Sequence, residues 1–91
     1  MQRTNRIKPK VLKKLKQEYD QIGTPCHGII KVVKDTKYGF VDEEGRVLIP
    51  PMYDWGSSFC KMRLYGKVYI GAYVTAGGFQ TIITPKNRKI I

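Results

Sequence analysis

Residues 33–51 have the sequence VKDTKYGFVDEEGRVLIPP, in which two short runs rich in β-branched and aromatic residues flank an acidic turn. Such residues fit the pleated, half-buried surface of a sheet, so the runs predict strands over 37–42 and 46–49. Pro50 and Pro51 have no N–H to donate to a sheet, so we expect them to end the second strand. The stretch therefore predicts a β-hairpin.

The turn of this hairpin is acidic and has the sequence DEEG over residues 42–45. Gly45 supplies the positive φ that a hairpin loop of this kind requires. Adjacent carboxylates on a tight, exposed turn do not converge on one point, and no further ligands accompany them. We therefore expect a turn here and no metal site.

The same β pattern continues along the chain, with glycine about every ten residues marking the turns. It predicts further strands over 28–34, 58–65, 67–75 and 78–84. The fold class is therefore mainly β with one N-terminal α-helix. We expect an antiparallel six-stranded meander over 28–91, which can curl into a partly closed barrel.

A helix is predicted over residues 9–22, in front of the meander. Apolar residues recur there at spacings of three and four, and lysines fill the other side. Pro9 suits the first helical turn, and Gly23 suits the position just past the end, where a left-handed backbone is common. We expect an apolar stripe to cover the apolar face of the meander, and its members are Val11, Leu12, Leu15, Tyr19 and Ile22.

Length and composition predict one small folded domain. The chain has 91 residues, and its hydrophobic fraction of 42% is too high for a sequence that is disordered by composition. We expect a flexible basic arm over 1–8 and a single domain over 9–91. Since the sequence has no apolar run of about 18 residues and no signal-peptide pattern, we expect no membrane span and a reduced, cytoplasmic location.

The charge is strongly basic and unevenly distributed. The formal net charge is +10, and residues 1–20 hold seven basic side chains against two acidic ones. Residues 86–91 add Lys86, Arg88 and Lys89 without any acid. Basic ends suit contact with a polyanion, although a solvated surface that keeps the protein soluble explains them equally simply.

Side-chain alternation predicts how the last three strands pair. An odd loop of three residues, 65–67, places Leu64 opposite Val68 and brings the apolar residues of both strands onto one face. A two-residue loop in the next hairpin then places Val74 opposite Phe79 and continues that face. Burial of apolar residues favours these two registers.

The other face of this meander is the most specific functional surface that the sequence predicts. Lys61 and Arg63 alternate there with Tyr69 and Tyr73, and basic residues interleaved with aromatic ones can hold phosphates while bases stack on the rings. An ordinary sheet exterior also favours tyrosine. The first hypothesis is a nucleic-acid-binding module, to which the helix adds phosphate contacts from Lys13, Lys14 and Lys16.

A second hypothesis assigns the protein to a different class, protein interaction. Tyr53, Trp55 and Phe59 lie close together in the sequence and form either an aromatic plug at the rim of the core or, through Tyr53 and an exposed Trp55, an anchor for a partner. The partner would present an acidic surface, and the module would be of a kind encoded by mobile elements or phages. The sequence leaves monomer and dimer open, because exposed strand edges favour pairing and edge lysines oppose it.

Cys26 and His27 invite a catalytic interpretation, but neighbours on an extended segment point to opposite sides. Cys60 would be the third ligand of a zinc site that has no evident fourth, and it is better explained as a small core residue. No catalytic triad or phosphate-binding glycine loop is present. We therefore expect no enzymatic activity, no metal and no cofactor.

A family resemblance covers about 27 residues, from Val33 to Phe59. This segment resembles a WG-type β repeat, with a tyrosine at the tryptophan position. The matching residues are Lys37-Tyr38-Gly39-Phe40-Val41-Asp42, Gly45 to Pro51, Tyr53-Asp54 and Phe59.

The resemblance implies an antiparallel β architecture and a binding or scaffolding role, and it brings no shared catalytic motif. A degraded second copy would run from Gly71 to Pro85, without the aromatic-glycine start of the first. A repeat that cannot bury its own core needs neighbours, and here the N-terminal helix is expected to serve as the cap.

Overall fold

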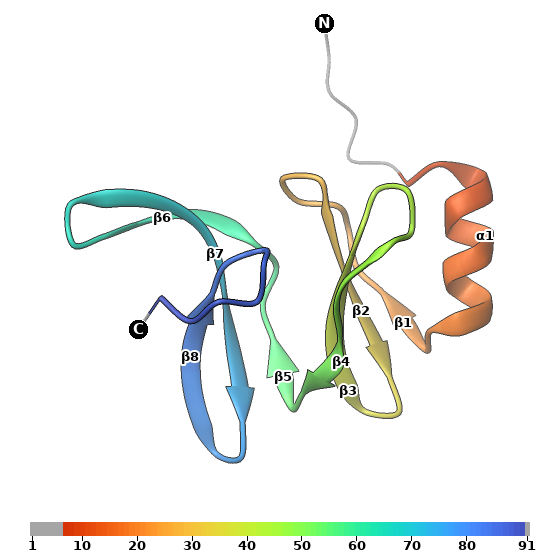
Figure 1. Ribbon diagram of the computed structural model, residues 1–91. Coiled ribbons are helices and arrows are strands. Elements are labelled where there is room, and N and C mark those ends of the chain that lie inside the picture. The colour runs from red at the N-terminus through yellow and green to blue at the C-terminus, as the bar shows by residue number, and fades with distance from the viewer. Residues whose placement is uncertain (1–6, 91) are drawn as a thin grey trace, which may run out of the picture.

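The structure is a computed structural model that describes residues 7–90, which form one helix and eight strands (Figure 1). The mainly β fold with one N-terminal helix is confirmed, whereas the expected number of six strands is wrong. The two additional strands have two residues each, too few to leave an alternating pattern in the sequence. The elements are α1 (Pro9–Glu18), β1 (Gln21–Ile22), β2 (Ile29–Lys34), β3 (Lys37–Asp42), β4 (Val47–Tyr53), β5 (Trp55–Gly56), β6 (Cys60–Leu64), β7 (Lys67–Ala76) and β8 (Phe79–Ile83).

The strands form two antiparallel sheets and no closed barrel among the described residues. The first sheet has the order β1-β2-β3-β4, and the second sheet joins β5 and β6 to one edge of β7 and β8 to the other. Trp55 pairs with Thr75 near the end of β7, while Leu64 pairs with Lys67 at its start. The long strand β7 therefore carries two short partners in succession.

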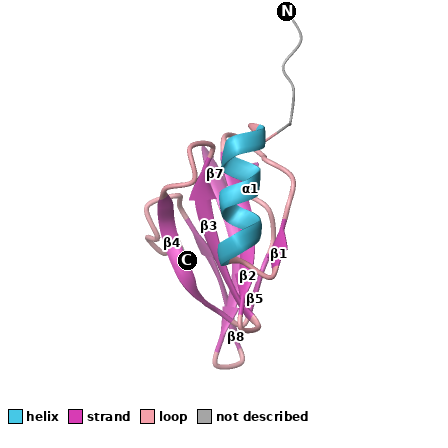
Figure 2. Cartoon of the chain, turned by 90° about the vertical axis from the view of Figure 1, so that its right-hand side faces the viewer, coloured by secondary structure: helices cyan, strands magenta, loops and turns pink. Residues whose placement is uncertain are grey.

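The layers follow the order helix, first sheet, second sheet. α1 covers one face of the first sheet, and the second sheet lies against the opposite face (Figures 1 and 2). The helix stripe was expected to cover the last strands, and it instead packs against β2 and β3. The helix-side core consists of Val11, Leu15, Tyr19, Ile30, Val32 and Val41. The inter-sheet core consists of Ile29, Phe40, Ile49, Tyr53, Phe59, Ala72, Val74 and Ile83.

The helix ends at Glu18, four residues before the predicted end at residue 22. Tyr19 already has an extended backbone with φ −121° and ψ 150°, and the N–H of Asp20 donates to the carbonyl of Val33 at 2.7 Å. Gly23 does not cap the helix, because its N–H donates to Lys31 in the same ladder. Pairing with β2 satisfies these backbone groups, and it outweighs the helical spacing of the apolar residues.

Pro50 and Pro51 lie inside β4 and do not end it, contrary to the prediction. Phe40 pairs with Ile49 and Tyr38 with Tyr53, so three residues of β4 lie between these two pairs where β3 has one. The prolines occupy this bulge, where residues are left without a ladder partner. A Cβ on Gly39 would lie 2.6 Å from the Ile49 oxygen and from the Pro51 nitrogen, so glycine is required opposite the bulge.

The hairpin β6–β7 has a two-residue loop, Tyr65-Gly66, and the predicted three-residue loop is wrong. Both loop residues have positive φ, 52° and 76°, as a type I′ turn requires. This turn matches the right-handed twist of the strands. Val68 is 54% exposed, so this end of the hairpin extends beyond the core and burial does not select its register.

The hairpin β7–β8 also differs from its predicted register. Its loop is Gly77-Gly78, and Val74 pairs with Thr81 rather than with Phe79. A shift of two residues leaves every side chain on its predicted face, because the period of a strand is two.

Within residues 7–90 the structure has no helix that is both long and apolar enough to cross a membrane.

Candidate functional site

The basic and aromatic residues predicted for one face of the meander lie on opposite faces. Lys61 pairs with Ile70, and Met62 pairs with Tyr69. Directly paired residues share a face, so Lys61 and Arg63 point to one side of the β6–β7 ribbon and Tyr69 and Tyr73 to the other. The combined phosphate-binding and base-stacking surface is therefore not assembled, because the two-residue loop inverts the faces.

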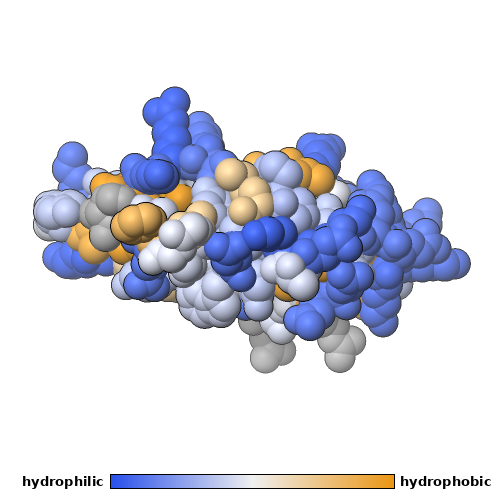
Figure 3. All heavy atoms as spheres, turned by 90° about the horizontal axis from the view of Figure 1, so that it is seen from below, coloured by the Kyte–Doolittle hydropathy of each residue, from blue (hydrophilic) through white to orange (hydrophobic). Residues whose placement is uncertain are grey.

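The helix lysines form a separate basic surface. Lys13, Lys14 and Lys16 are exposed, and within residues 7–90 none of them forms an ion pair with a carboxylate. α1 and β6 lie at opposite ends of the molecule (Figure 1). Seen from below, the side that carries α1 is predominantly hydrophilic, whereas hydrophobic residues are exposed over the second sheet (Figure 3).

Trp55 and Tyr73 lie together on the outer face of the second sheet. Trp55 pairs with Thr75, and Tyr73 is two residues away on the same strand, so the two rings are diagonal neighbours on one face. They are 44% and 42% exposed. Ser57 holds this segment in place, because its N–H donates to the carbonyl of Tyr73 and its Oγ accepts from the Tyr73 N–H, both at 2.9 Å. We call the surface formed by Trp55, Tyr73, Thr75 and Gln80 the aromatic face.

Tyr53 and Phe59 belong to the core and not to this surface. Tyr53 is 6% exposed, and its hydroxyl donates to Asn87 Oδ1 at 2.5 Å. Burial raises the pKa of Tyr53, and the hydrogen bond to Asn87 acts in the opposite direction. Phe59 meets the ring of Phe40 edge to face, with centroids 4.7 Å apart. Of the two predicted partner-binding residues, the structure exposes Trp55 and buries Tyr53.

Asp54, which lies between Tyr53 and Trp55 in the sequence, links the two sheets. Its carboxylate forms an ion pair with Lys37 of β3 and accepts a hydrogen bond from the Gly77 N–H at 3.0 Å. The hydrogen bond from Lys37, followed by that from Gly77, lowers the pKa of Asp54. The side chain thus connects the start of the repeat-like segment to the loop of the last hairpin.

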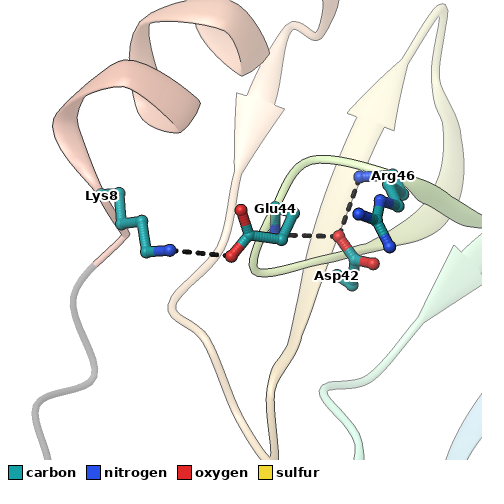
Figure 4. A network of polar contacts seen from close by, with 4 residues as sticks. All are labelled: Lys8, Asp42, Glu44 and Arg46. Atoms are coloured by element: carbon teal, nitrogen blue, oxygen red, sulfur yellow. Dashed lines mark hydrogen bonds and ion pairs between the residues drawn. The ribbon is translucent and has the colours of Figure 1, made fainter.

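Asp42 and Glu44 of the acidic turn make polar contacts that stabilise the fold (Figure 4). Asp42 Oδ1 accepts hydrogen bonds from the N–H groups of Glu44 and Arg46, each at 2.9 Å. Glu44 forms an ion pair with Lys8 at 2.8 Å, which raises the pKa of Lys8 mainly through the hydrogen bond. Residues 1–6 of the predicted arm lie outside the described residues, while Ile7 contacts the helix-side core.

Cys26 and His27 lie in a tight turn rather than in an extended segment. Cys26 and Ile29 exchange two backbone hydrogen bonds, and His27 and Gly28 between them have positive φ. Cys60 is exposed, so its interpretation as a core residue is wrong. The part of the chain that the structure describes contains no group of three or more His, Cys, Asp or Glu residues placed to hold a metal ion.

A pocket of about 250 Å³ on the first sheet was not foreseen from the sequence. Its charged residue is Lys31, whose ammonium lies 5.7 Å from the ring centroid of Tyr38. The one available signal was a lysine between the buried residues Ile30 and Val32, which places it on the opposite face of β2. The pocket is lined by Gln21, Ile22, Gly23, Lys31, Val33 and Tyr38.

Comparison with known proteins gives one match. Residues 38–61 match the family model of the WG containing repeat. No curated protein and no solved structure matches the chain. The match confirms the resemblance seen in the sequence, and the degraded copy suggested around 71–85 lies outside it.

The geometry gives physical reasons for the residues of the matched segment. Gly39 makes room for the bulge of Pro50 and Pro51, and Phe40 and Phe59 contact each other in the inter-sheet core. The matched segment begins in the first sheet and ends in the second, so it forms the joint between them.

Proposed function

We propose that this domain is a non-enzymatic protein-interaction module that binds its partner through the aromatic face. The observation that carries the proposal is the exposure of Trp55 beside Tyr73 on paired strands. Tryptophan and tyrosine are enriched among the residues that dominate binding energy at interfaces. The match to the WG repeat, for which the resemblance implies a binding or scaffolding role, supports the same class of function.

The charge of the chain indicates the kind of partner. A formal net charge of +10 attracts acidic surfaces and accelerates their association at low salt. Two of the three acidic residues of the hairpin turn are already engaged, since Asp42 accepts backbone hydrogen bonds and Glu44 pairs with Lys8. We therefore propose a partner with an acidic rim around an apolar or aromatic contact area.

A second candidate, nucleic-acid binding, is favoured by the helix lysines alone. Lys13, Lys14 and Lys16 are exposed without carboxylate partners in the described part of the chain. Such a surface supplies phosphate contacts without base stacking, and its affinity should fall with salt by about 0.9 log units per log unit for each phosphate engaged on duplex DNA.

A pull-down with and without nuclease separates the two candidates. The experiment uses the full chain, the Trp55→Ser variant and the control Phe79→Ser, which removes an 81% exposed ring from the other face of the same sheet. The proposal expects a stoichiometric protein partner that survives nuclease, is lost with W55S and is retained with F79S. Loss of all captured material on nuclease treatment would instead establish the second candidate.

A further inference from the structure

We propose that the outer edge of β6 binds an extended peptide segment in which acidic and apolar residues alternate, by adding it to the second sheet as a further strand. β6 pairs with β7 on one side, and among residues 7–90 no strand pairs with its other side. This site lies on a different strand from Trp55 and goes beyond the proposed function, because it does not depend on whether the aromatic face binds.

The other sheet edges are less suited to accept a strand. β4 contains Pro50 and Pro51, which have no N–H to donate. The edge of β8 is partly covered by the C-terminal residues, since Ile83 forms a bridge with Lys89 and the Ile90 N–H donates to the Ile82 carbonyl at 2.7 Å. β1 and β5 have two residues each, whereas β6 offers five consecutive residues without proline.

The side chains of β6 define the chemistry of the added strand. Lys61 and Arg63 are both exposed on one face, and within the described residues neither has a carboxylate partner. Cys60, Met62 and Leu64 occupy the other face, where Cys60 is exposed and the other two are half-buried. Directly opposed residues share a face, so a complementary strand has acids against the two cations and apolar residues against the other three.

The same pattern opposes a second copy of this chain as the occupant. Antiparallel pairing of two β6 edges about Met62 would place Lys61 of each copy opposite Arg63 of the other. Like charges directly opposite each other are destabilising, and cations on edge strands are a common protection against self-pairing. The charge pattern therefore disfavours self-pairing of β6 while it favours an acidic strand.

Binding of a synthetic peptide tests the proposal. The probe is a short peptide that alternates glutamate and valine, and the controls are a peptide of the same composition with its glutamates in one block and a probe methylated on alternate backbone nitrogens. Isothermal titration calorimetry gives the affinities, and amide hydrogen exchange reports on β6. We expect the probe to bind and to protect the amides of β6 that face away from β7, and both controls to bind at least about tenfold more weakly, a difference of about 1.4 kcal/mol.

Charge reversal provides a second test within the protein. The variant K61E/R63E should lose binding of the acidic probe and gain binding of a lysine–valine peptide, whereas the control K10E/K34E makes the same change in net charge on α1 and β2 and should keep the original preference. Unchanged circular dichroism shows that both variants fold. Equal binding of the block or methylated peptides, unprotected β6 amides, or equal effects of the two variants would overturn the proposal.

Discussion

The hairpins β2–β3 and β6–β7 turn through loops of the same kind but have different surroundings. Asp35-Thr36 and Tyr65-Gly66 both have positive φ at the two loop positions, as type I′ turns require. β2–β3 is covered on one face by α1 and on the other by the second sheet, whereas the end of β6–β7 has Val68 and Tyr65 exposed. Burial fixes the side-chain faces of the first hairpin, and turn geometry fixes those of the second.

The largest expected difference between the two hairpins comes from truncating a side chain in each. Phe40→Ala should lower the free energy of unfolding by about 3–5 kcal/mol, because Phe40 is fully buried against Phe59. Val68→Ala should change it by less than about 0.5 kcal/mol, since Val68 is 54% exposed. Urea titrations of both variants measure the difference. A similar cost for both would mean that β6–β7 is also packed in a core.

The bulge at Pro50 and Pro51 is expected to give the next largest effect. Gly39→Ala should cost about 1–3 kcal/mol, because its new methyl group would meet backbone atoms of Ile49 and Pro51 at 2.6 Å. Gly23→Ala is the matched control in the same sheet, where the nearest atom is the Lys31 oxygen at 3.4 Å. Thermal unfolding of the two variants should show a clearly lower midpoint for G39A, and equal midpoints would contradict the close approach.

Substitution of the glycine in the β6–β7 loop is expected to have a smaller effect on the free energy of unfolding. Gly66 has a φ of 76° with no atoms near the position of a Cβ, so Gly66→Ala should cost about 1–2 kcal/mol through backbone strain alone. Gly66→Asn should cost less, because asparagine tolerates this conformation. Denaturant unfolding measures both. If G66A were neutral, the type I′ turn would not set the register of this hairpin.

The smallest expected effect concerns the link between the sheets at Asp54. Lys37 and the Gly77 N–H lower the pKa of this carboxyl below its usual 3.8 in the folded protein. The ionised Asp54 carboxylate therefore stabilises the folded protein above pH 3.8, and this contribution is lost as the pH falls through the lower pKa of the folded state. Asp54→Asn should flatten the dependence of the unfolding midpoint on acid pH. An unchanged acid limb would show that the ion pair contributes nothing, as many exposed pairs do.

These differences explain which parts of the fold the sequence predicts. The strands over 29–34 and 37–42 have buried residues on both faces, so their pattern is strong and their predicted positions are close to those observed. The end of the helix was missed because Tyr19 and Ile22 contact the helix-side core from an extended chain as well as from a helix. The bulge at the prolines depends on the partner strand, which local sequence does not describe.

The candidate site was also predicted only in part, because residue type can be read directly from the sequence whereas strand register cannot. Trp55 was identified as a possible anchor from residue type, and the structure exposes it. The prediction that Lys61 and Arg63 share a face with Tyr69 and Tyr73 is wrong. It assumed that burial of apolar residues determines the register, but this hairpin extends beyond the core. The Tyr65-Gly66 pair was the signal for the correct two-residue turn.

The register of β6–β7 is the claim on which the proposed peptide-binding edge depends, and cross-strand nuclear Overhauser effects measure it directly. The structure predicts contacts between backbone protons of Met62 and Tyr69 and between those of Lys61 and Ile70. Contacts of Met62 with Ile70 and of Leu64 with Val68 would contradict it, since Lys61 and Arg63 would then share a face with Tyr69 and Tyr73.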